Sequence, residues 1–193
     1  LNTPKKPGET SADADFLRRA AAQLTAVFDK EYGGFGTAPK FPSPHDLIFL
    51  LRYAALAGDR AARTMAEDTL KAMYKGGIFD HFGGGFSRYS TDREWLAPHF
   101  EKTLYDNALL AFVYTEAWQS GHMALYRYVA EATLDYCMRE LLSPAGGYYC
   151  AQDADSRGEE GAYYLFTPEE VRSVLGEDAG RHFCECYDIT PEG

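Results

Sequence analysis

The sequence predicts a mainly α-helical protein in which helical hairpins form part of an (α/α) toroid, with small β-hairpins in the long loops at one end. Amphipathic helical segments alternate along the chain with segments that are apolar almost all round. Long and short connections alternate as well, and the long ones, near 33, 76 and 145, open with Gly-Gly and an aromatic or apolar residue. If successive helices run up and down, every long loop lies at one end.

The first half of the chain shows the alternation. Apolar residues at helical spacing predict an amphipathic helix over 12–30. Ser43-Pro44 predicts the start of a second helix, with a Ser cap and Pro in the first turn. This helix, to about residue 56, is apolar on most sides and belongs in an inner layer. A tight turn at 57–59 then leads to an amphipathic outer helix over 60–74.

The second half repeats this order. An apolar inner helix is predicted over 99–119, a tight turn at 120–122 and an amphipathic helix over 123–142. Thr167-Pro168-Glu169-Glu170 is a capping box that starts a short helix, and a last helix covers 177–187. Alternating segments predict two β-hairpins, 78–82 with 86–90 and 148–151 with 162–166. Residues 1–11 form a linker or arm, and 12–193 form one partial toroid domain, a fragment of a larger protein.

Composition narrows the classes of function. The 193 residues are 46% hydrophobic and 25% charged, which is ordinary for a globular protein. The net charge of −10 argues against nucleic acid or an anionic membrane as a partner. The chain shows neither an apolar run long enough to span a membrane nor a signal-peptide pattern. Four irregularly spaced cysteines do not form a disulfide framework, so reduced thiols and a cytoplasmic location are expected.

The stretch 76–107 is the predicted centre of function. It holds five of the 18 glycines and two of the five histidines, together with many aromatic and charged residues. Connections between helices usually have about 2–8 residues, and long ordered loops are usually functional. Many of the chain's aromatic residues gather in these glycine-rich loops, which suits a pocket lined by amphipathic rings.

Two histidines and two acids in this stretch are candidate catalytic residues. His81 or His99 could act as a general acid or base, although a histidine in a hairpin can also be purely structural. Glu101 could act with them, but an acid in the first turn of a helix is expected for the dipole alone. Asp106 and Asn107 lie within an otherwise apolar helix, where polar groups are costly to bury unless paired. One of them should therefore face a polar cavity or fix a loop.

The third loop adds two carboxylates, Asp153 and Asp155. Asp-x-Asp-x-x-Gly is similar to the start of an EF-hand, but Arg157 stands at a ligand position and no bidentate Glu follows, so that site is rejected. A weaker calcium site, a carboxylate pair for glycosidic chemistry and simple turn chemistry all remain open. No metal site and no cofactor are predicted. The expected ligand-binding residues are Asp80, Phe86, Arg88, Tyr89, Trp95, Asn107 and Gln152.

Three long motifs carry a resemblance to a known family. GGFGTAPKFPSP at 33–44, GGIFDHFGGGFSRYSTDREWLAPHFEKTLYDNA at 76–108 and GGYYCAQDADSRGEEGAYYLFT at 146–167 resemble the YyaL-type thioredoxin-domain-containing proteins, which include spermatogenesis-associated homologues. The resemblance implies an N-terminal thioredoxin-like domain followed by a helical toroid similar to N-acylglucosamine 2-epimerases and six-hairpin glycosidases. The thioredoxin-like domain is absent from this chain, and the seven predicted helices are fewer than a complete toroid has.

Two hypotheses follow for function. In the first, the chain is a fragment of a carbohydrate-active domain. An epimerase-like version has His81 or His99 moving a proton beside a carbonyl, and a glycosidase-like version pairs Asp153 or Asp155 with Glu101 or Asp80. In the second, the chain is a non-catalytic binding or scaffold module that works with the thioredoxin-like domain of the parent chain. The expected ligand in either case is a sugar-like small molecule.

Overall fold

The computed structural model describes residues 14–191, so the predicted arm at 1–11 lies outside the described residues. Seven α-helices occupy this described part, as predicted. They are α1 (Ala14–Val27), α2 (Pro44–Ala57), α3 (Arg60–Lys75), α4 (Leu104–Gly121), α5 (Ala124–Tyr136), α6 (Pro168–Leu175) and α7 (Glu177–Tyr187). Among these residues, none of the helices is both long enough and apolar enough to cross a membrane.

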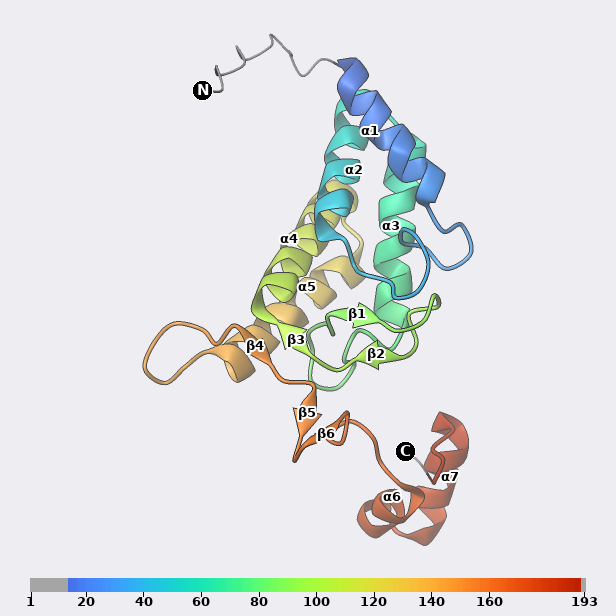
Figure 1. Cartoon of the computed structure of the whole chain (residues 1–193), viewed down its shortest axis with the longest axis vertical. Coiled ribbons are helices and arrows are strands. Elements are labelled where there is room, and N and C mark those ends of the chain that lie inside the picture. The colour runs from blue at the N-terminus through green and yellow to red at the C-terminus, as the bar shows by residue number, and fades with distance from the viewer. Residues whose placement is uncertain (1–13, 192–193) are drawn as a thin grey trace, which may run out of the picture.

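The first five helices form the two predicted layers (Figure 1). The apolar helices α2 and α4 pack against each other, and the amphipathic helices α3 and α5 pack beside them as hairpin partners. The core between them is filled by fully buried residues such as Leu47, Leu50 and Leu70. The buried Tyr114 hydroxyl donates to the carbonyl of Leu70 at 2.7 Å, so even this core tyrosine is satisfied.

The connections segregate to the two ends as the alternation predicted. Figure 1 shows the long loops together at one end of the helical body and the short turns at the other. The short turns end their preceding helices in left-handed conformations, at Gly58 with φ 69° and at His122 with φ 53°. The protein therefore has a loop end, and the candidate residues of all three long loops belong to it.

Short strand pairs connect the loops. β1 (Tyr89–Ser90) pairs with β2 (Pro98–His99), β3 (Lys102–Thr103) with β4 (Ala151–Gln152), and β5 (Asp155–Ser156) with β6 (Glu159–Glu160), all antiparallel. A bridge between Lys40 and Ser90 joins the first loop to the second, and β3–β4 joins the second to the third. The three loops are thus one hydrogen-bonded layer.

The predicted pairing of 148–151 with 162–166 was wrong. Ala151 pairs with Thr103 of the second loop, and the third loop closes a shorter hairpin over 155–160. Arg157 and Gly158, at φ 58° and 83°, form its two-residue turn. Two successive positive φ values match the right-handed twist of a tight hairpin, which explains why the chain turns there. The other predicted hairpin is present as a bridge between Phe79 and Phe86.

One turn recurs at the start of each long loop. FDKEYGGF at 28–35 and FDHFGGGF at 79–86 each close with an antiparallel bridge between their terminal phenylalanines, and LSPAGGY at 142–148 closes with Leu142 and Tyr148. In the first two turns the aspartate carboxylate accepts backbone N–H groups, from Glu31 and Tyr32 or from Phe82 and Gly83. In the third turn, Ser143 takes the place of the aspartate.

A buried lysine fastens each of the first two turns. Lys40 Nζ donates to Asp29 Oδ2 at 2.8 Å and to the Gly33 carbonyl at 2.7 Å. Lys102 Nζ donates to Asp80 Oδ2 at 2.8 Å and to the Gly84 carbonyl at 3.0 Å. Both lysines are almost fully buried. No lysine follows position 102 in the sequence, so the third turn has no equivalent downstream lysine.

Several helix ends differ from the prediction. Ser43 precedes α2 in a left-handed conformation, with φ 45°, and its side chain forms no cap. α4 starts at Leu104 rather than 99, because residues 98–99 and 102–103 are strands and Thr103 Oγ1 accepts the N–H of Asp106 as the cap.

α5 ends in a π-helical turn, η1 (Cys137–Leu141). The Thr167–Glu170 capping box of α6 is confirmed, and α6 packs on α7 below the loop end (Figure 1).

Candidate functional site at the loop end

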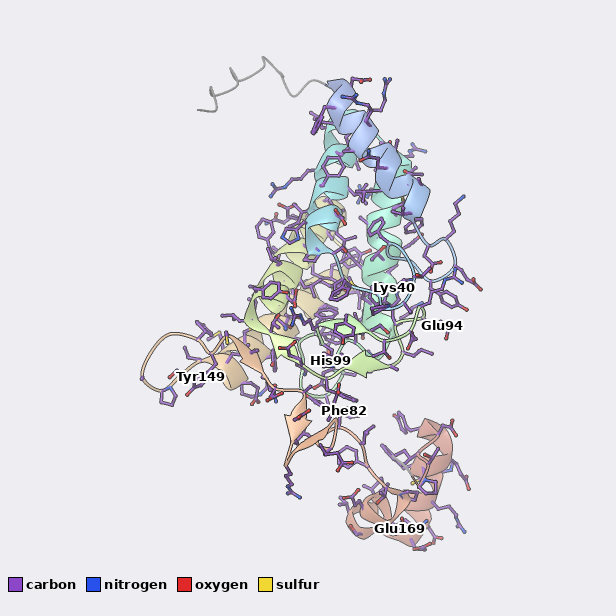
Figure 2. The ribbon with its side chains drawn as sticks, in the orientation of Figure 1. Lys40, Phe82, Glu94, His99, Tyr149 and Glu169 are labelled. Carbon is purple, nitrogen blue, oxygen red and sulfur yellow. The ribbon has the colours of Figure 1, made fainter. Side chains whose placement is uncertain are left out.

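The β1–β2 pairing brings four predicted residues together. Tyr89 lies opposite His99 in the register, and the Arg88 N–H donates to the Glu101 carbonyl at 2.9 Å. Figure 2 shows His99 at the loop end of the helical body. Because adjacent strands hold their opposite residues about 4.5–5.5 Å apart, this pairing fixes two short segments ten residues apart as one surface.

His99 is held in a defined orientation. Its Nδ1 lies 2.6 Å from Glu160 Oε1, which comes from the third loop, and its Nε2 lies 4.0 Å from Glu101 Oε2. Its ring stacks on Tyr89 with centroids 4.8 Å apart. A carboxylate oxygen accepts hydrogen bonds, so the neutral ring carries its proton on Nδ1. The lone pair of the neutral imidazole is then on Nε2, beside Glu101.

Arg88 provides a fixed positive charge next to this imidazole. One of its terminal nitrogens, Nη1, donates to Glu101 Oε2 at 2.8 Å. The hydrogen bond to Glu101 raises the guanidinium pKa further above its usual value, with a smaller contribution from Tyr105. Arg88 and Glu101 therefore form a charged pair whose carboxylate also faces His99.

Asp106 lies in the first turn of α4, close enough to Arg88 to feel its charge. Its carboxylate is largely buried and accepts the Thr103 hydroxyl at 2.6 Å. Burial raises the pKa of this carboxyl above its usual value, while Thr103 and the nearby Arg88 charge oppose that shift. Asp106 therefore both completes the helix cap and places a second acid close to Arg88.

The first loop adds an aromatic side chain that was not predicted from the sequence. Phe41 packs on Tyr89 at a tilt of 36° with centroids 4.9 Å apart, so Phe41, Tyr89 and His99 form a row of three rings. The bridge between Lys40 and Ser90 places Phe41 there. Glu160 was missed as well, since nothing local distinguishes it from Glu159. We call Phe41, Arg88, Tyr89, His99, Glu101, Tyr105, Asp106 and Glu160 the loop-end cluster.

His81 lies apart from this cluster in an exposed position. Its ring contacts Tyr74 and Phe79 edge-on, with centroids 5.1 Å and 5.2 Å away. The neighbouring Asp80 accepts from Lys102 and from two backbone N–H groups of its turn. Burial would raise the pKa of Asp80, but these hydrogen bonds outweigh it and lower the pKa. Asp80 thus holds the turn, and His81 packs against its outer side.

Three residues expected to bind ligand have packing roles. Phe86 and Trp95 are fully buried, and the indole N–H of Trp95 donates to the Tyr32 carbonyl at 3.0 Å. The Trp95 ring also covers Gly34, where any Cβ would lie 2.5 Å from the indole. Asn107 accepts the N–H of Phe86 at 2.7 Å and donates to its carbonyl at 3.0 Å. As the sequence analysis anticipated for one member of the Asp106–Asn107 pair, Asn107 fixes a loop.

The predicted residues of the third loop are dispersed. Asp153 accepts the N–H of Asp155 at 3.2 Å, which is turn chemistry. Asp155 belongs to β5 and pairs with Glu160 through the backbone. Gln152 accepts the Tyr136 hydroxyl at 2.9 Å. Within residues 14–191, no three His, Cys, Asp or Glu side chains form a group that could hold a metal ion.

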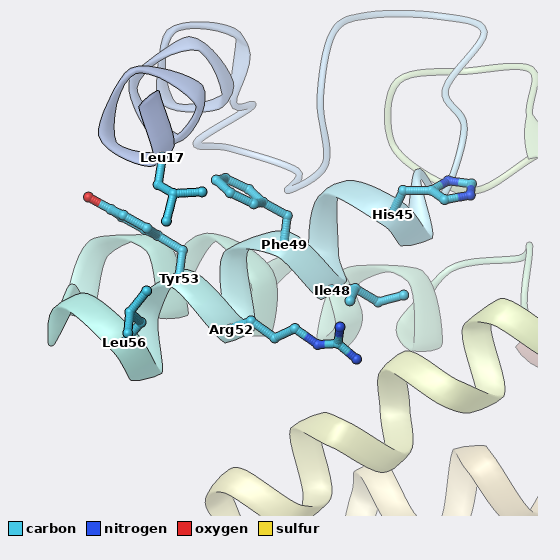
Figure 3. Close-up of a pocket in the computed structure, with 7 residues that line it drawn as sticks. All are labelled: Leu17, His45, Ile48, Phe49, Arg52, Tyr53 and Leu56. Atoms are coloured by element: carbon cyan, nitrogen blue, oxygen red, sulfur yellow. The ribbon is translucent and has the colours of Figure 1, made fainter. Parts of the chain in front are cut away.

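Two surface grooves lie elsewhere. One of about 330 Å³ between α1 and α2 is lined by Leu17, His45, Ile48, Phe49, Arg52, Tyr53 and Leu56 (Figure 3). A second of about 330 Å³ lies between the first loop and α3. Neither includes a residue of the loop-end cluster. The loop-end cluster is therefore defined by its polar geometry and not by enclosure.

This arrangement of helical hairpins is that of an (α/α) toroid. A cellobiose 2-epimerase from Bacillus thermoamylovorans superposes with a TM-score of 0.63 at 11% identity, over 89% of this chain and 53% of that chain. An unsaturated glucuronyl hydrolase specific for heparin superposes with a TM-score of 0.60 at 15% identity, over 90% and 53%. At these identities the likeness establishes the fold, and it confirms the predicted class.

The chain is also a close relative of one named protein. Spermatogenesis-associated protein 20 from Homo sapiens is 49% identical over 170 residues, which cover 82% of this chain and 22% of the human protein. The predicted resemblance to the spermatogenesis-associated proteins is thereby confirmed. The chain spans about a fifth of the length of that relative. No protein-family model matches the sequence.

Proposed function

We propose that the chain is part of a carbohydrate-active domain whose loop-end cluster transfers a proton beside the carbonyl of a sugar. The observation that carries the proposal is the geometry of His99. Glu160 holds Nδ1 at 2.6 Å, which leaves Nε2 as the acceptor of the neutral ring beside the Arg88–Glu101 pair. A base oriented by a carboxylate and placed beside a fixed cation is what enolisation of a sugar needs.

The proposed step uses the residues as follows. His99 Nε2 removes the proton from carbon 2 of the open-chain sugar and becomes an imidazolium. The C–H electron pair forms a C1–C2 double bond, and the carbonyl oxygen becomes an enolate, which the Arg88 guanidinium stabilises. Return of the proton to carbon 2 regenerates the neutral imidazole, and it gives the epimer when the enediolate first turns its opposite face towards His99 Nε2. General acid–base catalysis of this kind contributes about 10²–10⁴-fold.

The epimerase-like version is better supported than the glycosidase-like one. The carboxylates of Asp80 and Asp153, two of those predicted for glycosidic chemistry, accept the backbone N–H groups of their own turns. His81 packs edge-on against two rings, whereas His99 contacts carboxylates from two loops. The names of the solved neighbours include both an epimerase and a hydrolase, so the shared fold does not choose between them.

The decisive experiment follows exchange at carbon 2. The intact protein is incubated with a panel of reducing sugars in heavy water, and deuterium at carbon 2 is measured by NMR. We expect uptake that falls at least about 100-fold in His99→Ala, because the base is removed. His81→Ala is the matched control and should retain exchange. If no sugar in the panel takes up deuterium, or if His81→Ala abolishes exchange while His99→Ala does not, the assignment fails.

A second function is favoured by a different observation. Asp80, Trp95, Asn107 and Asp153 hold loops in place, so much of the predicted site is architecture. This favours a non-catalytic module that binds a sugar-like ligand or serves the thioredoxin-like domain of a parent chain. Saturable sugar binding with no exchange at carbon 2 in any member of the panel would support this module over the enzyme.

A further inference from the structure

We infer that the loop-end cluster takes an uncharged sugar and discriminates against sugar acids and sugar phosphates. The inference rests on the proposed function and names its substrate class. It follows from how the charges of the cluster are already paired, and from the rings that surround them.

The charge of the cluster's cation is already compensated by a carboxylate. Arg88 is tied to Glu101 twice, through the backbone at 2.9 Å and through Nη1 and Oε2 at 2.8 Å. The strand register therefore delivers the carboxylate to the guanidinium before any ligand arrives. A phosphate or carboxylate ligand would compete with Glu101 for the guanidinium, whereas sites that recognise these groups present an arginine with its fork free.

Carboxylates exceed cations around His99. Glu160 lies 2.6 Å from its Nδ1 and Glu101 lies 4.0 Å from its Nε2, against the single guanidinium of Arg88. The next cation along the chain, Lys102, is buried and bonded to Asp80. Arg157 lies in the turn of the β5–β6 hairpin, and Glu159 follows it on the same hairpin. An added negative charge would therefore meet a net repulsive field.

The remaining surface of the cluster suits a neutral sugar. Phe41 is 46% exposed and Tyr105 is 53% exposed, so both rings keep accessible faces next to the polar groups. Sugar rings combine apolar C–H faces with hydroxyl groups. The aromatic faces can cover the C–H faces of the sugar. The surplus carboxylate oxygens can accept hydrogen bonds from its hydroxyl groups.

The test measures binding separately from turnover. The intact protein is titrated with glucose, glucuronate and glucose 6-phosphate, at low and at high salt, and the NMR shifts of the His99 and Tyr89 rings report occupancy. We expect glucose to bind at least about tenfold more tightly than either anion at low salt. The difference in affinity between glucose and the anions should be smaller at high salt, because screening weakens the repulsion.

Two variants identify the source of the discrimination. Glu101→Gln frees Arg88 and removes one negative charge. The affinity for glucose 6-phosphate should therefore rise relative to the affinity for glucose. Glu116→Gln is the matched control, because it frees Arg52 from another arginine–glutamate ion pair, between α2 and α4. Its glucose-to-phosphate ratio should stay at the wild-type value.

The outcomes separate this inference from the proposed function. If an anionic sugar binds as tightly as glucose, the inference is overturned while proton transfer can stand. If glucose is preferred but carbon 2 does not exchange, the inference holds for a binding site and the catalytic proposal fails. If none of the three sugars perturbs His99 or Tyr89, both are overturned.

Discussion

Buried lysines are the residues whose environment departs furthest from expectation. Lysine is almost never fully buried unless it is paired, and both Lys40 and Lys102 are paired with an aspartate and a glycine carbonyl. Their ammonium groups also lie over aromatic rings, that of Lys40 over Trp95 at 5.2 Å and that of Lys102 over Tyr136 at 4.6 Å. Each lysine thereby fixes the turn that begins a long loop.

Lys40→Met should strongly destabilise the protein. The substitution keeps the side-chain volume but leaves Asp29 and the Gly33 carbonyl without the ammonium donor. Removing one partner of a buried pair costs about 3–5 kcal/mol, and because Arg93 still holds Asp29 we expect a loss near the lower end, about 3 kcal/mol. Urea unfolding followed by circular dichroism measures it. The exposed Lys30→Met is the control, and equal losses in the two variants would contradict the role.

Asp29 should make stability depend on acid pH. Burial alone would raise its pKa, but hydrogen bonds from Arg93, Lys40 and two backbone N–H groups outweigh burial and hold the pKa well below its usual value. A depressed folded-state pKa gives stability that is fully present above the unfolded pKa, near 4. That stability is lost as pH falls through the folded value. The Asp29→Asn variant should be less stable than the wild type at neutral pH. Below about pH 4 its free energy of unfolding should decline less steeply than that of the wild type.

At the scale of elements, local patterns predicted most of the fold. The helices, the two short turns and the gathering of long loops followed from hydrophobic periodicity and turn residues, which act within a few positions. The strand pairs did not follow, because β3–β4 joins residues about fifty positions apart and its register depends on the packed helices. Ser43 does not cap α2: it lies in a left-handed conformation, three residues after the Lys40–Ser90 bridge.

The candidate site was predictable where its residues share one hairpin. Arg88, Tyr89, His99 and Glu101 were all named from the sequence, because one glycine-rich loop contains them. Phe41 and Glu160 come from other loops, and only the assembled layer brings them to Tyr89 and His99. The repeated FDxxxGGF segments were an overlooked pattern: in both of them the aspartate bonds to a buried lysine further along the chain.

The β5–β6 hairpin should control the orientation of His99, because it delivers Glu160. Gly158 has φ 83° in open space, so Gly158→Ala meets strain rather than a clash, and should cost about 1 kcal/mol. Gly36, with φ 77° and also in open space, is the matched control. We expect only Gly158→Ala to change the ¹⁵N shifts of the His99 ring. Equal shifts in both variants would show that the hairpin does not orient the imidazole.

For the whole molecule, the three long loops are versions of one turn with different fastening. In each, a glycine N–H donates to the carbonyl of the residue that opens the turn: Gly33 to Asp29, Gly84 to Asp80 and Gly146 to Ser143, all at 2.9 Å. Gly33 and Gly84 are buried under a lysine-fastened turn, whereas Gly146 is exposed and its turn contains neither the aspartate nor a following lysine. The free energy of local opening should therefore be lower in the third loop than in the first two.

Amide hydrogen exchange tests this gradient, because local opening requires less free energy where fewer contacts hold a turn. The Gly146 amide should exchange at least about tenfold faster than those of Gly33 and Gly84, which corresponds to about 1.4 kcal/mol of opening free energy. Lys102→Met should then bring the Gly84 amide towards the Gly146 rate while Gly33 stays protected by Lys40. A slow Gly146 amide, or a Gly84 amide unaffected by the loss of Lys102, would show that the helices alone hold the loops. With the expected result, the lysines rather than the helix packing determine which loops of the candidate site are rigid and which can move.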